Sequence, residues 1–209
     1  MHRLPLVLLL ALWAPAARAA LPASEGAVRP IGVGSPAPTA VLTSLDGKPV
    51  DLAAVFAAQP TILVFYRGGW CPFCNRHLAS LASAEIDLRR LGYQIVAISP
   101  DPVPALGRTS AQLHLRYHLL SDRELKVSGR YQVAYRIPAA DEPDYRANGI
   151  NLPRVPGGAD YWLTIPTAFV IGRDGRVKFV SFNADPSVMI PADRLVAAAK
   201  AALPPTAAN

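Results

Sequence analysis

The sequence is poor in cysteine: only Cys71 and Cys74 among its 209 residues carry a thiol. Two cysteines three positions apart close a loop too small to constrain the unfolded chain much, so the spacing argues against a structural staple. No His/Cys pair lies near them to complete a four-ligand zinc site. We expect neither a metal nor an organic cofactor.

Long apolar runs and basic runs are also scarce. The one marked apolar stretch, residues 6–13, is far shorter than the roughly 20 residues that cross a bilayer, so we expect no stable membrane insertion of the mature protein. The formal net charge of +6 is scattered along the chain and forms no Lys/Arg run. Nucleic acid is therefore not an expected partner.

Residues 1–19 match the pattern of an export signal. His2 and Arg3 form a short basic start, the apolar stretch follows, and Ala17-Arg18-Ala19 supplies the small-x-small cleavage pattern. We expect cleavage after Ala19 and a protein that works outside the cytoplasm, in a bacterial periplasm. An uncleaved membrane anchor is the disfavoured alternative, because Pro15 and Arg18 interrupt the run.

The remaining chain predicts one α/β domain, residues 28–205, since strand-like and helix-like patterns alternate and no linker divides them. A stretch rich in Pro, Gly, Asp and Asn, residues 139–162, predicts a long surface excursion. The expected strands are 40–45, 61–66, 94–99, 119–121, 167–171 and 176–181, and the expected helices are a short one capped by Asp51, then 72–91, 103–117, 124–131 and 192–203.

The cysteine pair lies where a buried strand is expected to end and a helix to begin. Arg67-Gly68-Gly69-Trp70 breaks the strand, and Pro72 suits the first helical turn. A helix N-terminus carries unpaired N–H groups and a partial positive charge, which favour a thiolate. We expect Cys71 to attack and Cys74 to resolve the resulting intermediate. An inert buried pair is the alternative.

Residues next to the pair have two interpretations each. Arg67, Arg76 and His77 would add to the stabilisation of the Cys71 thiolate, although His77 is equally compatible with a solvated surface position. Trp70 either shields the sulfur atoms or serves packing alone.

Residues farther along are weaker candidates. Asp101 follows a strand, so it either caps the next helix or belongs to a site at the sheet edge. His114 and His118 lack acidic or sulfur partners for a metal. Glu85 lies about three helical turns beyond Cys74, too far for a proton acceptor, and Tyr66 is expected in the core.

Four passages resemble the thioredoxin-like superfamily and, more narrowly, the peroxiredoxin-like branch of the alkyl hydroperoxide reductase and thiol-specific antioxidant (AhpC/TSA) family. They are residues 64–74, 97–101, 119–122 and 166–177. The resemblance implies a thioredoxin-like fold, with a central mixed sheet flanked by helices. It also implies a cis bond at Ile165-Pro166 facing Cys71, with the Ile165 backbone pairing with an extended substrate.

The sequence departs from the family pattern at two positions, and these departures decide which function we expect first. Peroxiredoxins carry Thr or Ser three residues before the reactive cysteine and an Arg farther on, where this chain has Gly68 and Pro166. Since those groups orient the peroxide, we expect dithiol-disulfide exchange with protein substrates. The alternative is an antioxidant thiol peroxidase acting on hydrogen peroxide or alkyl hydroperoxides, supplied with electrons by a thiol redox partner. A non-enzymatic redox-sensing module is the third possibility, and the direction of electron flow is open.

Overall fold

A computed structural model describes residues 20–203, so the predicted export signal and residues 204–209 lie outside the described residues. The central strand, β3 (Thr61–Phe65), is buried along its whole length. Its apolar side chains alternate between two core clusters, with Ile62 and Val64 in one and Leu63 and Phe65 in the other. A strand buried on both faces has a continuous apolar sequence.

The strands around β3 form one mixed seven-stranded sheet, as the family resemblance implied. Its order is β2-β1-β5-β4-β3-β8-β9, in which β3, β4 and β5 run parallel and the other neighbours run antiparallel. The remaining bounds are β1 (Val41–Ser44), β2 (Pro49–Asp51), β4 (Gln94–Ser99), β5 (His118–Ser121), β8 (Thr167–Ile171) and β9 (Val177–Phe182).

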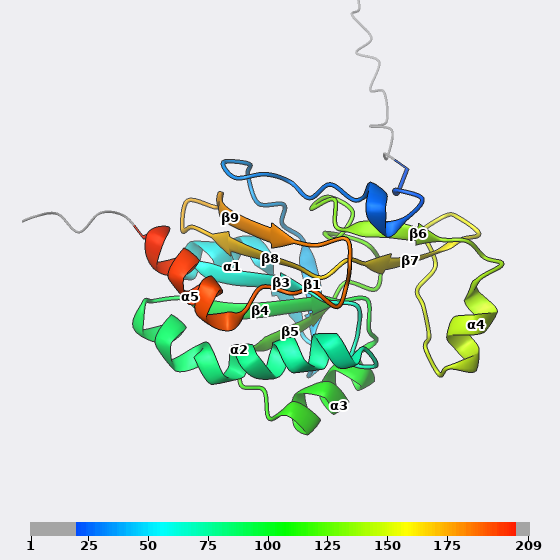
Figure 1. The fold of residues 1–209 in the computed structure, drawn as a ribbon, viewed down its shortest axis with the longest axis horizontal. Coiled ribbons are helices and arrows are strands. Elements are labelled where there is room, and N and C mark those ends of the chain that lie inside the picture. Colours follow the sequence, from blue (N-terminus) through cyan, green and yellow to red (C-terminus); the bar gives the residue numbers. More distant parts are fainter. Residues whose placement is uncertain (1–19, 204–209) are drawn as a thin grey trace, which may run out of the picture.

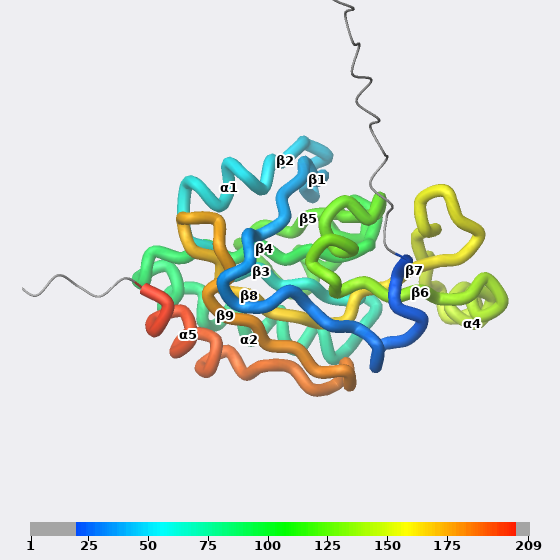
Figure 2. The backbone as a smooth tube through the Cα atoms, turned by 90° about the horizontal axis from the view of Figure 1, so that it is seen from above, coloured from blue at the N-terminus to red at the C-terminus, as the bar shows by residue number. Residues whose placement is uncertain are grey.

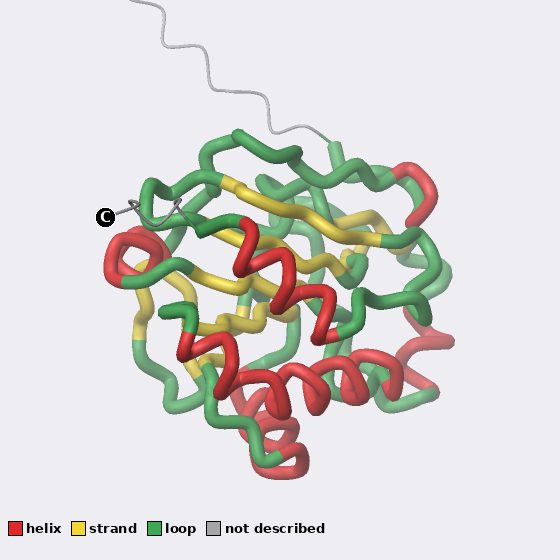
Figure 3. The backbone as a smooth tube through the Cα atoms, turned by 60° about the vertical axis from the view of Figure 1, so that its left-hand side comes forward, coloured by secondary structure: helices red, strands yellow, loops and turns green. Residues whose placement is uncertain are grey.

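Helices cover both faces of this sheet (Figures 1 and 2). The long α2 (Pro72–Arg90) packs on one face together with α3 (Val103–Leu113) and α5 (Ala192–Ala201), and α1 (Leu52–Ala58) packs on the other. Figure 3 shows α2 and α5 side by side on their face. No helix within residues 20–203 is long and apolar enough to cross a membrane.

Smaller elements gather at one end of the sheet, to the right in Figure 1. The strands β6 (Ala134–Ile137) and β7 (Tyr161–Thr164) form a separate antiparallel pair, and α4 (Glu142–Ala147) lies in the connection between them. The 3-10 helix η1 (Glu25–Ala27) is held nearby, because the N–H of Arg136 donates to the carbonyl of Pro22.

Most predicted elements are confirmed, with ends moved by a few residues. Asp51 caps α1 by accepting from the N–H of Ala53 at 2.9 Å. The hairpin of β8 and β9 turns where Gly175 adopts a φ of +66°, a conformation that favours glycine. The helix expected over 103–117 ends at Leu113, because His114 takes a left-handed φ of +52°.

The predicted helix over 124–131 is wrong, and a buried carboxylate explains why. Asp122 accepts from the backbone N–H groups of Lys126, Val127 and Ser128 and from the Ser128 hydroxyl. Those N–H groups converge on a single side chain, so the segment folds into turns around it. A side chain that competes for the backbone in this way outweighs local helix propensity.

The surface excursion predicted over 139–162 ends two residues earlier than expected, because residues 161 and 162 belong to a buried strand. Tyr161 and Trp162 open β7, and Trp162 is fully buried. Within the excursion, α4 is held by an ion pair between Glu142 and Arg146 at 2.7 Å. The aromatic pair belongs to the core because β7 pairs with β6, a long-range contact that composition does not reveal.

Replacing Asp122 by Ala should lower the free energy of unfolding by about 2–4 kcal/mol, because several buried N–H groups would lose their acceptor. Urea unfolding of the reduced protein measures this. Ser128→Ala, which removes one hydroxyl and leaves the carboxylate, should cost about 1 kcal/mol. An Asp122→Ala effect no larger than that of Ser128→Ala would contradict the assignment.

Candidate functional site

Cys71 lies at the turn between β3 and α2. It is the N-cap of α2, Pro72 begins the helix, and the N–H of Cys74 donates to the Cys71 Sγ at 3.4 Å. Both cysteines are free thiols. The predicted placement of the pair at a helix start is confirmed, and both cysteines are buried: Cys71 is 2 % exposed and Cys74 is 0 % exposed.

Two glycines permit the tight backbone turn that leads into Cys71. Gly68 has a φ of +151°, and a Cβ built on it would lie 2.8 Å from the Asp101 carboxylate and closer still to the Trp70 ring. A Cβ on Gly69 would collide with the Thr109 hydroxyl. The position where the family carries Thr or Ser therefore has no room for a side chain in this protein.

Asp101 holds this turn from the end of β4. Its carboxylate accepts from the N–H of Gly69 at 2.7 Å, and it is buried. The N-cap of α3 is Pro102, so the helix-cap interpretation of Asp101 is wrong, and its carboxylate instead contacts the cysteine turn at the sheet edge. Asn75, which sequence reasoning missed, secures the other side of the turn by donating to the Gly69 carbonyl at 2.8 Å.

Arg67 brings a positive charge to the site. Its guanidinium lies over the Trp70 ring, 5.1 Å from the ring centroid, and forms an ion pair with Glu25 at 3.7 Å. Tyr135 donates its hydroxyl to the same Glu25 carboxylate. Sequence reasoning missed Glu25 and Tyr135, since nothing local connects η1, β6 and the cysteine turn.

The two thiols have opposite pKa shifts. The side-chain hydrogen bond from the Cys74 thiol, helped by backbone N–H groups of the first helical turn and by Arg67, lowers the pKa of Cys71 to about 6 against the effect of burial. The same hydrogen bond, together with burial, raises the pKa of Cys74 well above its usual range. At neutral pH the pair is one thiolate and one thiol.

The other two cationic candidates, Arg76 and His77, lie in different surroundings. Arg76 lies over the partly exposed Phe73 ring, 4.8 Å from its centroid, and Arg67, not Arg76, is the cation that acts on Cys71. His77 is 9 % exposed, so its solvated-surface interpretation is wrong. Burial lowers the pKa of His77. Trp70 packs against the core cluster that contains both cysteines.

Apart from Asp101, the weaker candidates stay outside the site. Glu85 pairs with Arg89 at 2.6 Å, one turn farther along α2. Tyr66 is buried in the core, as predicted. His114 ends α3 and His118 begins β5, and within residues 20–203 no group of three His, Cys, Asp or Glu side chains is arranged to hold a metal ion.

The cis bond predicted at Ile165-Pro166 is wrong: every peptide bond in the described chain is trans. The proposed substrate pairing at Ile165 also fails, because its N–H donates to the Val133 carbonyl at 2.8 Å and its carbonyl accepts from the Thr167 hydroxyl at 3.1 Å. Both backbone groups already have partners within the chain. Pro166 instead lines a cavity on the α5 side of the sheet.

Replacing Arg67 by Ala should raise the pKa of Cys71 by about one unit, because a nearby cation favours the thiolate. The rate of iodoacetamide alkylation of Cys71, followed against pH by peptide mapping, measures this shift from the wild-type midpoint near pH 6. Arg76→Ala is the matched control and should leave the midpoint in place. The same midpoint in Arg67→Ala and wild type would show that Arg67 does not act on the sulfur.

Known proteins resemble the chain over most of its length. The model of the AhpC/TSA family matches residues 33–180. Peroxiredoxin Q from the chloroplast of Oryza sativa subsp. japonica is 29 % identical over 173 residues, which cover 80 % of this chain and 68 % of the relative. The peroxiredoxin Bcp of Escherichia coli is 28 % identical over 106 residues, covering 51 % and 67 %.

Solved structures share the architecture. The peroxidoxin BcpB of Mycobacterium tuberculosis superimposes with a TM-score of 0.64 at 22 % identity, and the match covers 82 % of this chain and 97 % of that one. This similarity supports a thioredoxin-like arrangement of sheet and helices. The family match includes β3, the cysteine turn and most of the β8–β9 hairpin, so the chain belongs to the AhpC/TSA family.

Proposed function

We propose that this protein is a thiol peroxidase of the peroxiredoxin type, with Cys71 as the peroxidatic cysteine and Cys74 as the resolving cysteine. The observation that carries the proposal is the burial of the Cys71 thiolate at 2 % exposure. A peroxide presents two small oxygen atoms that need only a narrow approach, whereas a disulfide within a folded protein needs a wide one.

The backbone next to the site also favours a small substrate. A disulfide-bearing protein would pair an extended strand with a free backbone segment beside the cysteine. Ile165 is the residue whose backbone was expected to pair with such a strand, but its N–H and its carbonyl already form hydrogen bonds within the chain. This observation reverses the ranking drawn from the sequence, which placed disulfide exchange first.

The reaction proceeds in two steps. The Cys71 thiolate attacks one peroxide oxygen, the O–O bond breaks, and the departing alkoxide or hydroxide takes a proton from solvent, leaving a sulfenic acid on Cys71. The Cys74 thiol then attacks that sulfur and releases water, which forms the Cys71–Cys74 disulfide. A dithiol partner supplies two electrons to restore both thiols.

The surrounding groups favour the first step. The hydrogen bond from the Cys74 thiol, the first-turn N–H groups of α2 and the Arg67 guanidinium lower the pKa of Cys71, so the thiolate is the main form at neutral pH. Because Gly68 supplies no hydroxyl to orient the peroxide, we expect a slower reaction than in peroxiredoxins that have one, by about 10²-fold for a missing donor.

Disulfide exchange is the second candidate, and the three-residue spacing of Cys71 and Cys74 favours it. The pair can close and open a disulfide within one helical turn, as a dithiol donor requires. A partner protein would first have to displace the turn that covers Cys71. The signal-like residues 1–19 support an activity outside the cytoplasm for either candidate.

Reduced protein should consume hydrogen peroxide and cumene hydroperoxide with dithiothreitol as reductant and should turn over insulin disulfides much more slowly. Cys71→Ser should lower peroxide consumption to the rate without protein. Cys74→Ser should keep the first oxidation and lose the internal disulfide. Insulin reduction that depends on Cys71, without peroxide consumption, would establish exchange in place of peroxidase activity.

A further inference from the structure

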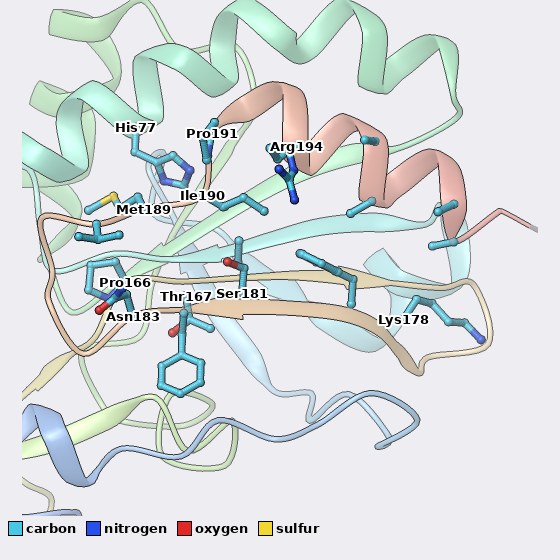
Figure 4. A pocket seen from close by; sticks show the side chains of 18 residues that line it. His77, Pro166, Thr167, Lys178, Ser181, Asn183, Met189, Ile190, Pro191 and Arg194 are labelled. Atoms are coloured by element: carbon cyan, nitrogen blue, oxygen red, sulfur yellow. The ribbon is translucent and has the colours of Figure 1, made fainter.

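A groove of about 750 Å³ runs between α5 and the strands β8 and β9, on the face of the sheet that α2 also covers (Figure 4). It lies outside the cysteine turn, since neither cysteine lines it. Its volume falls within the roughly 300–1,000 Å³ of small-molecule sites. The peroxidase chemistry described above makes no use of this groove.

The inner end of the groove adjoins the redox site. It is formed by Pro166, the loop before α5, and His77, which lies three residues beyond Cys74 on α2. Figure 4 shows the His77 ring directed from α2 toward this end. Its Nε2 is buried and has no hydrogen-bond partner within the described residues, and such a group costs free energy until a partner binds it.

Most of the side chains along the walls of the groove are apolar. Small side chains of α5, among them Ala198 and Ala201, line one wall, and Phe179 of β9 contributes to the opposite one. From Arg194 to Ala202 the helix rises about 12 Å at about 1.5 Å per residue. An extended chain of roughly ten carbon–carbon bonds has that length.

The charged residues of the groove favour a ligand with negative charge. No Asp or Glu lines it. Arg194 is exposed at the groove and, among residues 20–203, forms no ion pair or hydrogen bond. Lys178, at the far end, is already paired with Asp174 at 2.6 Å. The unpaired cation is therefore Arg194, which Figure 4 shows directed from α5 into the groove, between the His77 end and the Lys178 end.

We propose that this groove binds a long-chain carboxylate, with the head group on Arg194 and His77 and the acyl chain along the alanine face of α5. Arg194 supplies a planar fork of donors that suits a carboxylate. His77 supplies a second donor when its Nε2 carries a proton, because an ionised carboxylate only accepts hydrogen bonds. The apolar walls bury the methylene groups, each of which strengthens binding.

Isothermal titration with dodecanoate, below its micellar concentration, tests the site on the full chain. Wild type should bind saturably, and Arg194→Ala should bind about tenfold more weakly, since it loses a charge-assisted hydrogen bond. Lys200→Ala, which removes the same charge from α5 outside the groove, should bind like wild type. Ala201→Phe, which fills the outer groove, should abolish binding.

A neutral and a cationic probe distinguish recognition of the carboxylate charge from nonspecific hydrophobic binding of the alkyl chain. Arg194→Ala should bind dodecanol as wild type does, and dodecyltrimethylammonium should bind wild type more weakly than dodecanoate. Absent binding, equal dodecanoate affinity in Arg194→Ala and wild type, or equal affinity for both ionic probes would overturn the proposal. Cys71→Ser should bind dodecanoate normally, so this result is independent of whether the protein is a peroxidase.

Discussion

The hydrogen bond from the Gly69 N–H to the buried Asp101 carboxylate is the contact on which the site depends. It fastens the end of β3 to the end of β4 and sets the direction in which the chain enters α2. Because that entry makes Cys71 the N-cap, the first-turn N–H groups reach its sulfur. The same close approach to Asp101 requires glycine at position 68, and the nearby Thr109 hydroxyl requires glycine at position 69.

Burial and charge then divide the chemistry between the two sulfur atoms. Cys74 is enclosed and keeps its proton, while Cys71 accepts the hydrogen bond from that thiol and loses its own proton near pH 6. Coupling of this kind gives a nucleophile and a resolving thiol from one short motif. The enclosed position of Cys71 is the physical basis of our proposal that the substrate is a peroxide and not a protein disulfide.

Sequence patterns predicted the features that depend on neighbouring residues. The run that forms β4 and the helix start at Cys71 were predictable because burial and capping act locally. The ion pair of Arg67 with Glu25 was not, since it joins segments that meet only through the β6–β7 end of the fold. The trans bond at Pro166 shows that a resemblance carries over a fold more safely than a backbone detail.

The most direct test of this account is the product formed when the Cys74→Ser variant meets one equivalent of hydrogen peroxide. Mass spectrometry with a reagent selective for sulfenic acids should find one added oxygen on the Cys71 peptide, because the thiolate attacks and no thiol remains to resolve it. An unmodified Cys71, in a variant that still forms a stable mixed disulfide with a disulfide-bearing protein, would contradict the peroxidase account.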